Sequence, residues 1–549
     1  MGKQTPKTEY SAEYVKTLEA TVQEQQNEIT RLQQKLERMN ELLLNAQRAR
    51  FGQSSEKRAY VMADGEQLQL FNEAEAVQDV KAPEPTEETF TVQEHTRKKK
   101  RTADELTENL PVKEILLELP EELRQCECGA QMTPIGKKFI RQELEVIPKQ
   151  VYRVLYYTVT YACKECEQKT GETHVAQVAP PRPLLKHSLA SPSAVADVMT
   201  QKYVDGIPLA RQEKIWKRDG IELSRATMAN WVIQCAQTWL KPIYRQLRKA
   251  LLEQSVIHAD ETVVQVLKEE GKPATSESRM WLYASGQRSR KQIRYFEYQP
   301  DRSGKHPAAL LKDFRGCLVT DGYAGYDKVP QAVRCGCWAH MRRKWREAMP
   351  KGATMQTSQA AVGYNYCSKL FALEKKFSGM SSENRKFARQ AEAEPLLEAY
   401  WLWLKTLDPV PGSKLEEAVT YANNQKPYLC AFLEHGEVDI SNNLAENAIR
   451  PFVVGRKNWL FSDTPKGADS SAVIYSLVES AKVNDLEPRS YLWFLLDELR
   501  YLDKSPSAAE LETFMPWSPG IQKLLEKNTP DFSPRHLNGA VGFLYTGDY

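Results

Sequence analysis

The order of the apolar runs between residues 255 and 349 constrains the fold of this chain more than any other feature. Runs rich in Val, Ile and aromatic residues predict strands, and a helical pattern precedes the fourth of them. The strands are expected at 255–266, 279–285, 292–298, 317–321 and 332–337, and helices at 306–314 and 338–349. Three meandering strands, a helix and a fourth strand beside the first form the order of a ribonuclease-H-like α/β core, so we predict a mixed sheet of that class.

Acidic residues stand in the two strands that this order makes neighbours. Asp260 lies inside the first strand, and Asp321 ends the fourth and is followed by Gly322. The adjacent Glu261 is expected to point to the opposite face of its strand and not to bind metal, because successive side chains alternate. An acid at a strand end is by itself most often a turn former or a solvated residue. Only the pairing of the two acids suggests a shared site.

A third acid, Glu446, lies in a segment that reads as a helix capped by Asp439, Ser441 or Asn442 and ended before Pro451. Carboxylates held close together resist joint ionisation unless a cation lies between them, and an oxygen-rich site favours Mg²⁺ or Mn²⁺. Two such ions would bind both the attacking and the leaving oxygens of a displacement at phosphorus. The three acids therefore predict divalent-metal phosphodiester chemistry.

Seven motifs, in order along the chain, resemble those of the insertion-sequence 66 transposases, a group within the Asp-Asp-Glu class. They are Phe51–Lys57, Arg97–Arg101, His258–Thr262, Thr320–Tyr326, Gly336–Arg343, Asn442–Pro451 and Gly455–Phe461. The resemblance implies an enzyme that binds the ends of a mobile element and target DNA, cleaves DNA strands and transfers them. It also implies that Asp260, Asp321 and Glu446 are its catalytic acids and hold two Mg²⁺ or Mn²⁺ ions.

The spacing between the last two acids predicts an insertion in the core. Asp321 and Glu446 are 125 residues apart (446 − 321), which is more than a compact core needs. Apolar residues within 351–434 recur at helical spacing. This helical insertion would be either a satellite bundle packed on the core or a part that helps to hold DNA.

The net charge of the chain says little about its function, whereas local clusters of basic residues are informative. With 75 Lys plus Arg against 72 Asp plus Glu, the net charge of +3 does not by itself indicate a nucleic-acid-binding protein. Basic clusters suit phosphate contacts, although such runs are also common as solvated faces or flexible arms. The clusters near the acids contain Arg342 and Arg343 before the insertion, and Arg450, Arg456 and Lys457 after Glu446. Arg450 shares a helix face with Glu446 and is expected to orient that carboxylate or a phosphate.

A heptad repeat near the N-terminus predicts a coiled coil. The apolar positions are Val15, Val22, Ile29, Leu36 and Leu43, with Leu18, Leu32, Met39 and Ala46 at the complementary positions and Gln25 between them. We therefore expect residues 1–60 to form a homo-oligomer, the alternative being one amphipathic helix docked on its own core. The acidic, Pro-bearing stretch that follows predicts a linker at 61–96.

Residues 97–180 combine a basic arm with four cysteines in two close pairs, Cys126 with Cys128 and Cys163 with Cys166. Four thiolates suit a structural Zn²⁺ with no open coordination position, and the alternative is reduced cysteines packed in a small sheet. The first pair has one intervening residue where the resembling family usually has two. We expect the module to contact DNA or to stabilise the fold.

A second helical pair is expected at 181–245, ahead of the core. Its second helix begins after Ser224 and would present Arg225, Thr227 and Asn230 to a DNA groove if the pair is a helix-turn-helix. An ordinary helical hairpin has the same sequence pattern.

Cys337 and His340, three residues apart, also allow three interpretations. They could bind a second metal ion. They could instead be a buried cysteine and a helix-start histidine with a local hydrogen bond. Alternatively, His340 could contact the scissile phosphate.

Together these features predict a multidomain α+β transposase whose catalytic core spans 246–485 and is followed by a C-terminal helical region and tail at 486–549. The absence of a long apolar run predicts a cytoplasmic, nucleoid-associated protein without a membrane partner. Helper proteins of the same element could take part. Two other functions fit the same residues: a nuclease or resolvase that hydrolyses DNA without joining it, and a non-catalytic zinc- and coiled-coil-bearing DNA-binding regulator.

Overall fold

The computed structural model describes residues 149–162, 175–350, 353–502 and 506–525, together with scattered residues within 16–39, 112–116, 136–139 and at 168. It divides into two units, one formed by Met62–Val178 and the other by Met1–Val61 with Ala179–Tyr549. Among the described residues we find no helix with the length and hydropathy needed to span a bilayer.

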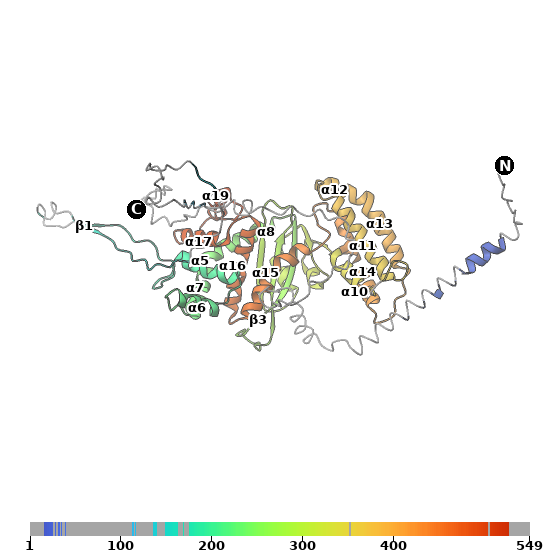
Figure 1. The fold of residues 1–549 in the computed structure, drawn as a ribbon, viewed down its shortest axis with the longest axis horizontal. Coiled ribbons are helices and arrows are strands. Elements are labelled where there is room, and N and C mark those ends of the chain that lie inside the picture. The colour runs from blue at the N-terminus through green and yellow to red at the C-terminus, as the bar shows by residue number, and fades with distance from the viewer. Residues whose placement is uncertain are drawn as a thin grey trace, which may run out of the picture. The chain divides into compact units, whose positions relative to one another are not determined.

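A mixed six-stranded sheet forms the centre of the larger unit (Figure 1). Its main strands run in the order β5-β4-β3-β6-β7, with β3 antiparallel to β4 and parallel to β6. The bounds are Val256–Val266 for β3, Glu277–Ser285 for β4, Arg294–Gln299 for β5, Cys317–Val319 for β6 and Val333–Cys335 for β7, with helix α9 at Lys305–Leu310. Strand β8, Phe461–Ser462, pairs in parallel with the end of β3. The first and fourth strands of this sheet are neighbours, so the predicted ribonuclease-H-like fold is confirmed.

Helix α16, Pro465–Val483, covers the open edge of strand β5. The hydroxyl oxygen of Ser476 accepts the backbone N–H of Phe296 at 2.8 Å, and that of Ser480 accepts the N–H of Arg294 at 3.0 Å. An edge strand otherwise leaves such groups unpaired. The two buried serines therefore complete the hydrogen bonding of the sheet.

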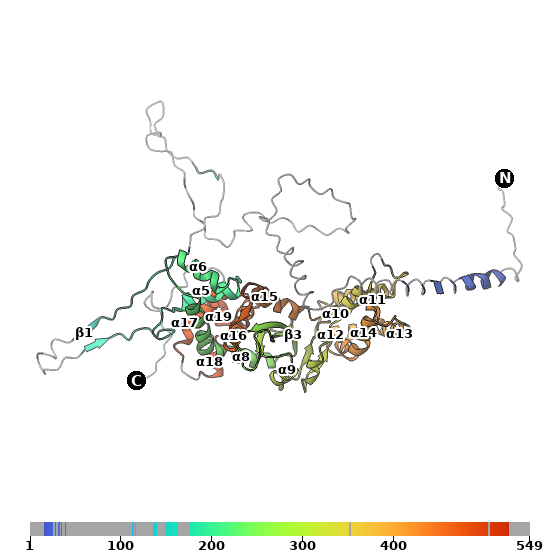
Figure 2. The same ribbon diagram turned by 90° about the horizontal axis from the view of Figure 1, so that it is seen from below.

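Helices that precede and follow the sheet share one hydrophobic core with β3, β4 and β5. They are α5 Pro192–Tyr203, α6 Leu209–Arg218, α7 Arg225–Cys235, the π-helix η3 Ala236–Leu240, α8 Lys241–Leu252, α15 Asn443–Trp459, α17 Pro488–Leu499, α18 Ala508–Glu512 and α19 Pro519–Leu524. Figure 2 shows α5 and α17 side by side although they are far apart in the sequence. The helical pair predicted at 181–245 is thus packed into the same body as the C-terminal helices.

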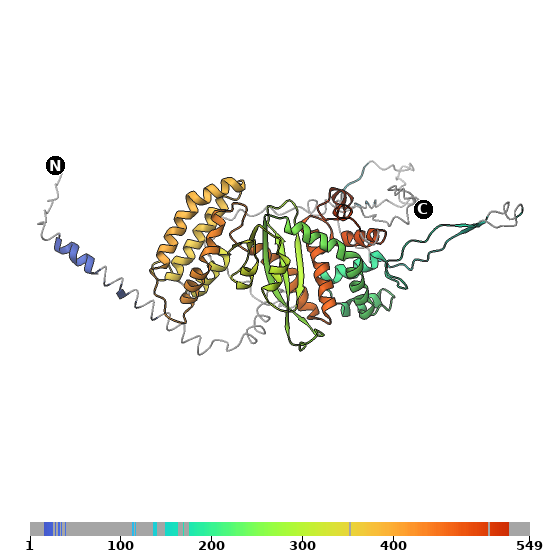
Figure 3. The same ribbon diagram turned by 180° about the vertical axis from the view of Figure 1, so that it is seen from behind.

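The insertion forms a helical bundle with its own hydrophobic core, built on strands β6 and β7 (Figure 3). Its elements are α11 Gln359–Lys376, α12 Ser382–Ala388, the π-helix η5 Arg389–Ala393, α13 Glu394–Leu404, α14 Lys414–Cys430 and the 3₁₀ helix η6 Ala431–Leu433, and α10 Trp338–Ala348, which precedes the insertion, packs into the same core. Trp338, Trp345 and Tyr400 are fully buried and contact one another edge to face around Tyr400. The predicted helical insertion is confirmed as a packed bundle, and its part in holding DNA stays a prediction.

Helix α15 corrects one boundary expected from the sequence. The helix was expected to end before Pro451, but it continues through this proline to Trp459. Ala445 and Ile449 before the proline and Phe452 after it are all buried in the shared core. Packing on both sides of Pro451 therefore outweighs the loss of one helical hydrogen bond.

The smaller unit contains a two-stranded antiparallel sheet of β1, Thr160–Ala162, and β2, Val175–Gln177. Cys126, Cys128, Cys163 and Cys166 lie outside the described residues. In the predicted coiled coil, residues 16–25 and the other described positions up to Met39 are helical, with Leu18, Val22, Leu32 and Met39 about half exposed or more.

Gly316, which directly precedes β6, should not tolerate a side chain. A Cβ atom at this position would overlap the carbonyl oxygen of Ser255, which accepts the N–H of Cys317 at 2.8 Å. Neither backbone can move without disturbing the pairing of β3 with β6. We expect Gly316→Ala to destabilise the protein by about 2–3 kcal/mol, measured by urea unfolding. Gly379→Ala, where the added Cβ meets no neighbour within 4 Å, is the control, and equal effects at the two positions would contradict this account.

Candidate catalytic site

The sheet brings the first two predicted acids together. His258 pairs with Val319 in the parallel register of β3 and β6, and Asp260 and Asp321 each follow two residues later, Asp321 just beyond the end of β6. Burial, then the neighbouring Glu261, and further Asp321 and Glu446 raise the pKa of Asp260 to about 7. The three acids, which come from β3, the end of β6 and α15, therefore lie close enough to influence one another electrostatically.

Asn442 fixes the start of α15 against β3. Its side-chain amide donates to the carbonyl oxygen of Ala259 at 2.8 Å, and its Oδ1 lies 3.2 Å from Nδ1 of His258. Burial lowers the pKa of His258 to about 4, which keeps this imidazole neutral. The sequence named Asn442 only as a candidate N-cap, whereas its buried side chain joins the helix to the strand that carries Asp260. Glu446 follows one turn later.

Two side chains of α10 contact Glu446. Nη2 of Arg343 lies 3.3 Å from Oε2, and Nε2 of His340 lies 3.6 Å from Oε1. Oε1 is buried and has no hydrogen-bond partner among the described residues. Arg450 was expected to orient the Glu446 carboxylate or a phosphate. In the structure Arg343 contacts this carboxylate, and Arg450 is exposed.

Cys337 adjoins the same carboxylate. One donor atom each of Cys337, His340 and Glu446 lie within 4.8 Å of one another, and the Cys337 sulfur also accepts the backbone N–H of Asn442. In the part of the chain that the structure describes, Asp260, Asp321 and Glu446 do not form such a group of three. A site for two ions roughly 3.5–4 Å apart does not need all its ligand atoms around a single point, because different ligands can bind different ions.

Glu261 has protein partners. Its carboxylate accepts hydrogen bonds from Nε of Arg302 at 2.6 Å and from the hydroxyl of Tyr326 at 2.8 Å, and only 3% of its side chain is exposed. Arg302 was not among the residues selected from the sequence, because nothing in its surroundings marks it. These contacts agree with the expectation that Glu261 is not a metal ligand.

Two of the cations predicted to bind DNA are instead engaged within the protein. Arg342 donates to the hydroxyl of Tyr364 at 2.8 Å and stacks on its ring. Arg456 donates to the hydroxyl of Thr262 and to the carbonyl oxygen of Val263 in β3. Both side chains therefore have partners within the protein, and their DNA contacts stay predictions.

The other residues predicted to contact DNA differ in their exposure to solvent. Arg225, Asn230, Arg450 and Lys457 are exposed, and Thr227 is half-buried with its N–H donated to Ser224. Their DNA contacts stay predictions.

Comparison with known proteins identifies the family of this chain. The model for the transposase IS66 family matches residues 187–470, more than half of the chain and all three acids. A leucine-zipper model described as transposase C of IS166 homeodomain matches residues 38–115, and the zinc-finger binding domain of transposase IS66 matches residues 124–167. The chain thus has N-terminal leucine-zipper and zinc-finger domains.

Individual relatives extend over most of the chain. The uncharacterized protein y4qI of Sinorhizobium fredii is 29% identical over 423 residues, which are 73% of this chain and 76% of that protein. The uncharacterized protein y4hP of the same organism is 25% identical over 492 residues, 85% of this chain and 86% of that protein. The Drosophila P element transposase strand transfer complex has a TM-score of 0.31 and 9% identity, covering 54% of this chain and 94% of that one. On the match to the family model, this chain belongs to the transposase IS66 family.

Proposed function

We propose that this protein binds the ends of an insertion sequence and catalyses divalent-metal-dependent DNA cleavage and strand transfer with Asp260, Asp321 and Glu446. Membership of the family implies DNA cleavage and strand transfer. The observation that carries the assignment of the acids is geometric: β3 and β6, the strands that lead to Asp260 and Asp321, pair in parallel, and Asn442 fixes the helix that carries Glu446 against β3.

The residues fit a pair of hard cations. The acids are crowded and partly buried, and Oε1 of Glu446 is a buried oxygen without a hydrogen-bond partner among the described residues. Mg²⁺ or Mn²⁺ bound there would activate water and stabilise charge on the phosphate. Asp260 and Asp321 would position the ions and Glu446 would bind one of them. The 3′-hydroxyl released by cleavage would then attack target DNA at the same site.

Neighbouring side chains would orient these ligands and the DNA. Asn442 fixes α15 relative to β3 and so sets the position of Glu446. Arg343 is half exposed, with 52% of its side chain accessible, and would hold Glu446 while presenting its free face to a phosphate. His340 lies beside the same carboxylate and would contact the scissile phosphate.

The N-terminal domains would supply assembly and further DNA contact. The exposed apolar positions of the heptad repeat, such as Leu18 and Val22, would be covered by another copy of the helix. The zinc-finger match over residues 124–167 supports a structural Zn²⁺, for which Cys126, Cys128, Cys163 and Cys166 would be the ligands.

A strand-transfer assay separates this function from that of a nuclease or resolvase. Element ends that already carry a free 3′-hydroxyl would be incubated with the protein, Mg²⁺ and a supercoiled target plasmid. A transposase joins them to the target, whereas an enzyme that only hydrolyses gives no joined product. Nicking of uncut ends without any joining of precut ends would reject strand transfer.

The raised pKa of Asp260 predicts a pH-dependent stability in metal-free protein. The folded state holds the proton more tightly than the unfolded state, so this contribution is present below about pH 4 and is lost as the pH rises to about 7. An asparagine carries no charge at any pH, so we expect Asp260→Asn to stabilise the metal-free protein at pH 8 by about 4 kcal/mol. At pH 4 the difference should vanish.

Thermal unfolding in a chelator at both pH values would measure this effect. Asp313→Asn is a matched control, because that carboxylate is 69% exposed and pairs loosely with Lys312. Its stability should follow that of the wild type. An Asp260→Asn protein less stable than the wild type at pH 8 would contradict the proposed burial of charge.

A further inference from the structure

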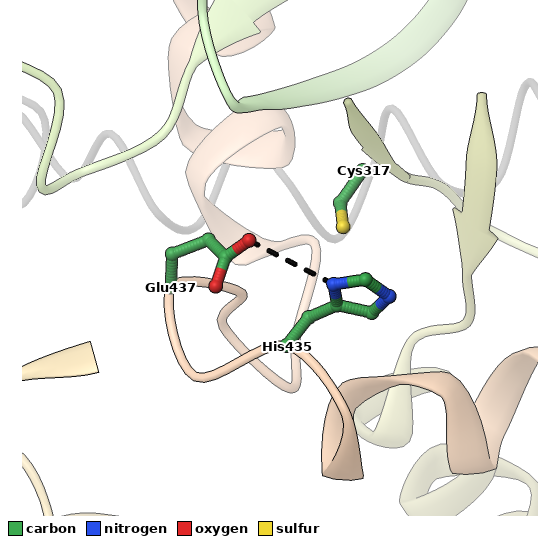
Figure 4. A group of neighbouring side chains, drawn as sticks. All are labelled: Cys317, His435 and Glu437. Atoms are coloured by element: carbon green, nitrogen blue, oxygen red, sulfur yellow. Dashed lines mark ion pairs between the residues drawn. The ribbon is translucent and has the colours of Figure 1, made fainter. Parts of the chain in front are cut away.

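A second cluster of metal-ligating side chains lies where the helical bundle rejoins the sheet. Cys317 is in β6, and His435 and Glu437 are in the segment between η6 and α15. One donor atom of each residue lies within 4.8 Å of the other two, and Nδ1 of His435 is 3.7 Å from a Glu437 carboxylate oxygen. Figure 4 shows the Cys317 sulfur directed towards the His435 ring. The catalytic assignment above uses none of these side chains.

A fourth donor is adjacent. The thiol of Cys335, on the neighbouring strand β7, is buried next to that of Cys317, although it is not among the three donors that lie within 4.8 Å of one another. It donates to the carbonyl oxygen of Val333 at 3.7 Å. A bound metal would displace the proton, as it does at cysteine ligands in general.

The turn that carries His435 and Glu437 is held firmly. The buried guanidinium of Arg389 donates to the carbonyl oxygens of Phe432, His435 and Val438 at 2.9, 2.8 and 2.8 Å. At Gly436 the backbone approaches the carbonyl oxygen of Ser382 so closely that a Cβ atom would overlap it. The backbone positions of both residues are therefore fixed by the protein.

The chemistry of the donors selects the metal. A set of thiolate sulfur, imidazole nitrogen and carboxylate oxygen suits Zn²⁺ better than Mg²⁺, which prefers oxygen ligands alone. Donor atoms around a tetrahedral Zn²⁺ are roughly 3.3–3.8 Å apart, so the cluster must contract. The side chains of His435 and Glu437 are 31% and 33% exposed and have the freedom to rotate inwards.

We propose that Cys317, Cys335, His435 and Glu437 bind one structural Zn²⁺, separate from the zinc-finger domain and from the catalytic acids. Four protein ligands leave no open position, as in structural sites. The ion would fasten β6 and β7 to the segment that ends at α15, nine residues before Glu446 (446 − 437). It would thereby fix the end of the bundle next to the catalytic core.

The zinc content of the purified full-length protein tests this proposal. We expect the double variant His435→Gln/Glu437→Gln to hold one zinc fewer per chain than the wild type, measured by elemental analysis under reducing conditions. Both positions are partly exposed, so the variant should fold, which circular dichroism would verify. Cys317→Ala should lose the same single ion. Cys367→Ala is the matched control, because Cys367 is a buried thiol of the same bundle outside the cluster, and it should keep every zinc.

Cobalt substitution gives a second, independent readout. Co²⁺ bound by thiolates has a sulfur-to-metal charge-transfer absorption. The double variant should show a weaker absorption per chain than the wild type, and the difference should equal the contribution of one site. Equal zinc content in the wild type and in the folded double variant would overturn the proposal. A disulfide between Cys317 and Cys335 in protein purified under reducing conditions would also overturn it. Asp321→Asn should retain all zinc, so failure of this proposal is distinct from failure of the catalytic one.

Discussion

Asp321→Asn is expected to abolish Mg²⁺-dependent DNA cleavage and strand transfer while the protein remains folded and binds DNA. An amide keeps the size of the carboxylate but removes the charge that would hold a divalent ion between β3 and β6. We expect the rate to fall by on the order of 10³-fold or more, equivalent to about 4 kcal/mol of transition-state stabilisation. Nicking and joining of a labelled element end, measured beside a gel-shift assay of DNA binding, would check this result.

The matched control is again Asp313→Asn, which changes an exposed carboxylate just before β6 and should leave both reactions unchanged. The same comparison tests the alternative of a non-catalytic regulator, in which the wild type itself would show no Mg²⁺-dependent nicking. If Asp321→Asn nicked DNA within a few-fold of the wild-type rate, Asp321 would not be a catalytic ligand, whatever the family resemblance implies.

The order of the sheet could be predicted from the sequence because each strand is a separate apolar run with its own turn signals. That order alone made Asp260 and Asp321 neighbours, and the register of His258 with Val319 agrees. Strand β8 could not be predicted, since two residues carry no periodicity. The path of α15 through Pro451 could not be predicted either, because it depends on partners far away in sequence that bury Ile449 and Phe452.

The partners of individual side chains were harder to predict from the sequence than the strands and helices that carry them. Arg342 and Arg343 are adjacent in one basic helix, yet Arg342 packs on Tyr364 of the insertion while Arg343 reaches Glu446. Which of the two is covered depends on where α11 lies, and no local pattern encodes that. The cluster of Cys317 with His435 has no sequence signal either, because its members are 118 residues apart (435 − 317) and no metal-binding spacing joins them.

The buried guanidinium of Arg389 links several parts of the insertion, so its loss is expected to destabilise the protein strongly. Arg389 is fully buried and forms a two-point ion pair with Glu374, at 2.8 and 2.7 Å. Arg385 donates to the same carboxylate. Arg389 also donates to the carbonyl oxygens of Phe432 in η6 and of His435 and Val438 in the segment after it. It thereby joins α11 to the segment that leads to Glu446.

Arg389→Met should lower the free energy of unfolding by about 3–5 kcal/mol. It removes one of the two cations that pair with the buried Glu374 carboxylate, and it leaves three carbonyl oxygens without their hydrogen-bond donor. Urea unfolding would measure the loss, and proteolysis would be expected to cut earliest between η6 and α15. Lys386→Met is the matched control: this cation pairs at the surface with Glu434 at 2.9 Å, so its loss should cost less than about 1 kcal/mol. A similar, small effect of the two single variants would show that the bundle is held by its hydrophobic core alone.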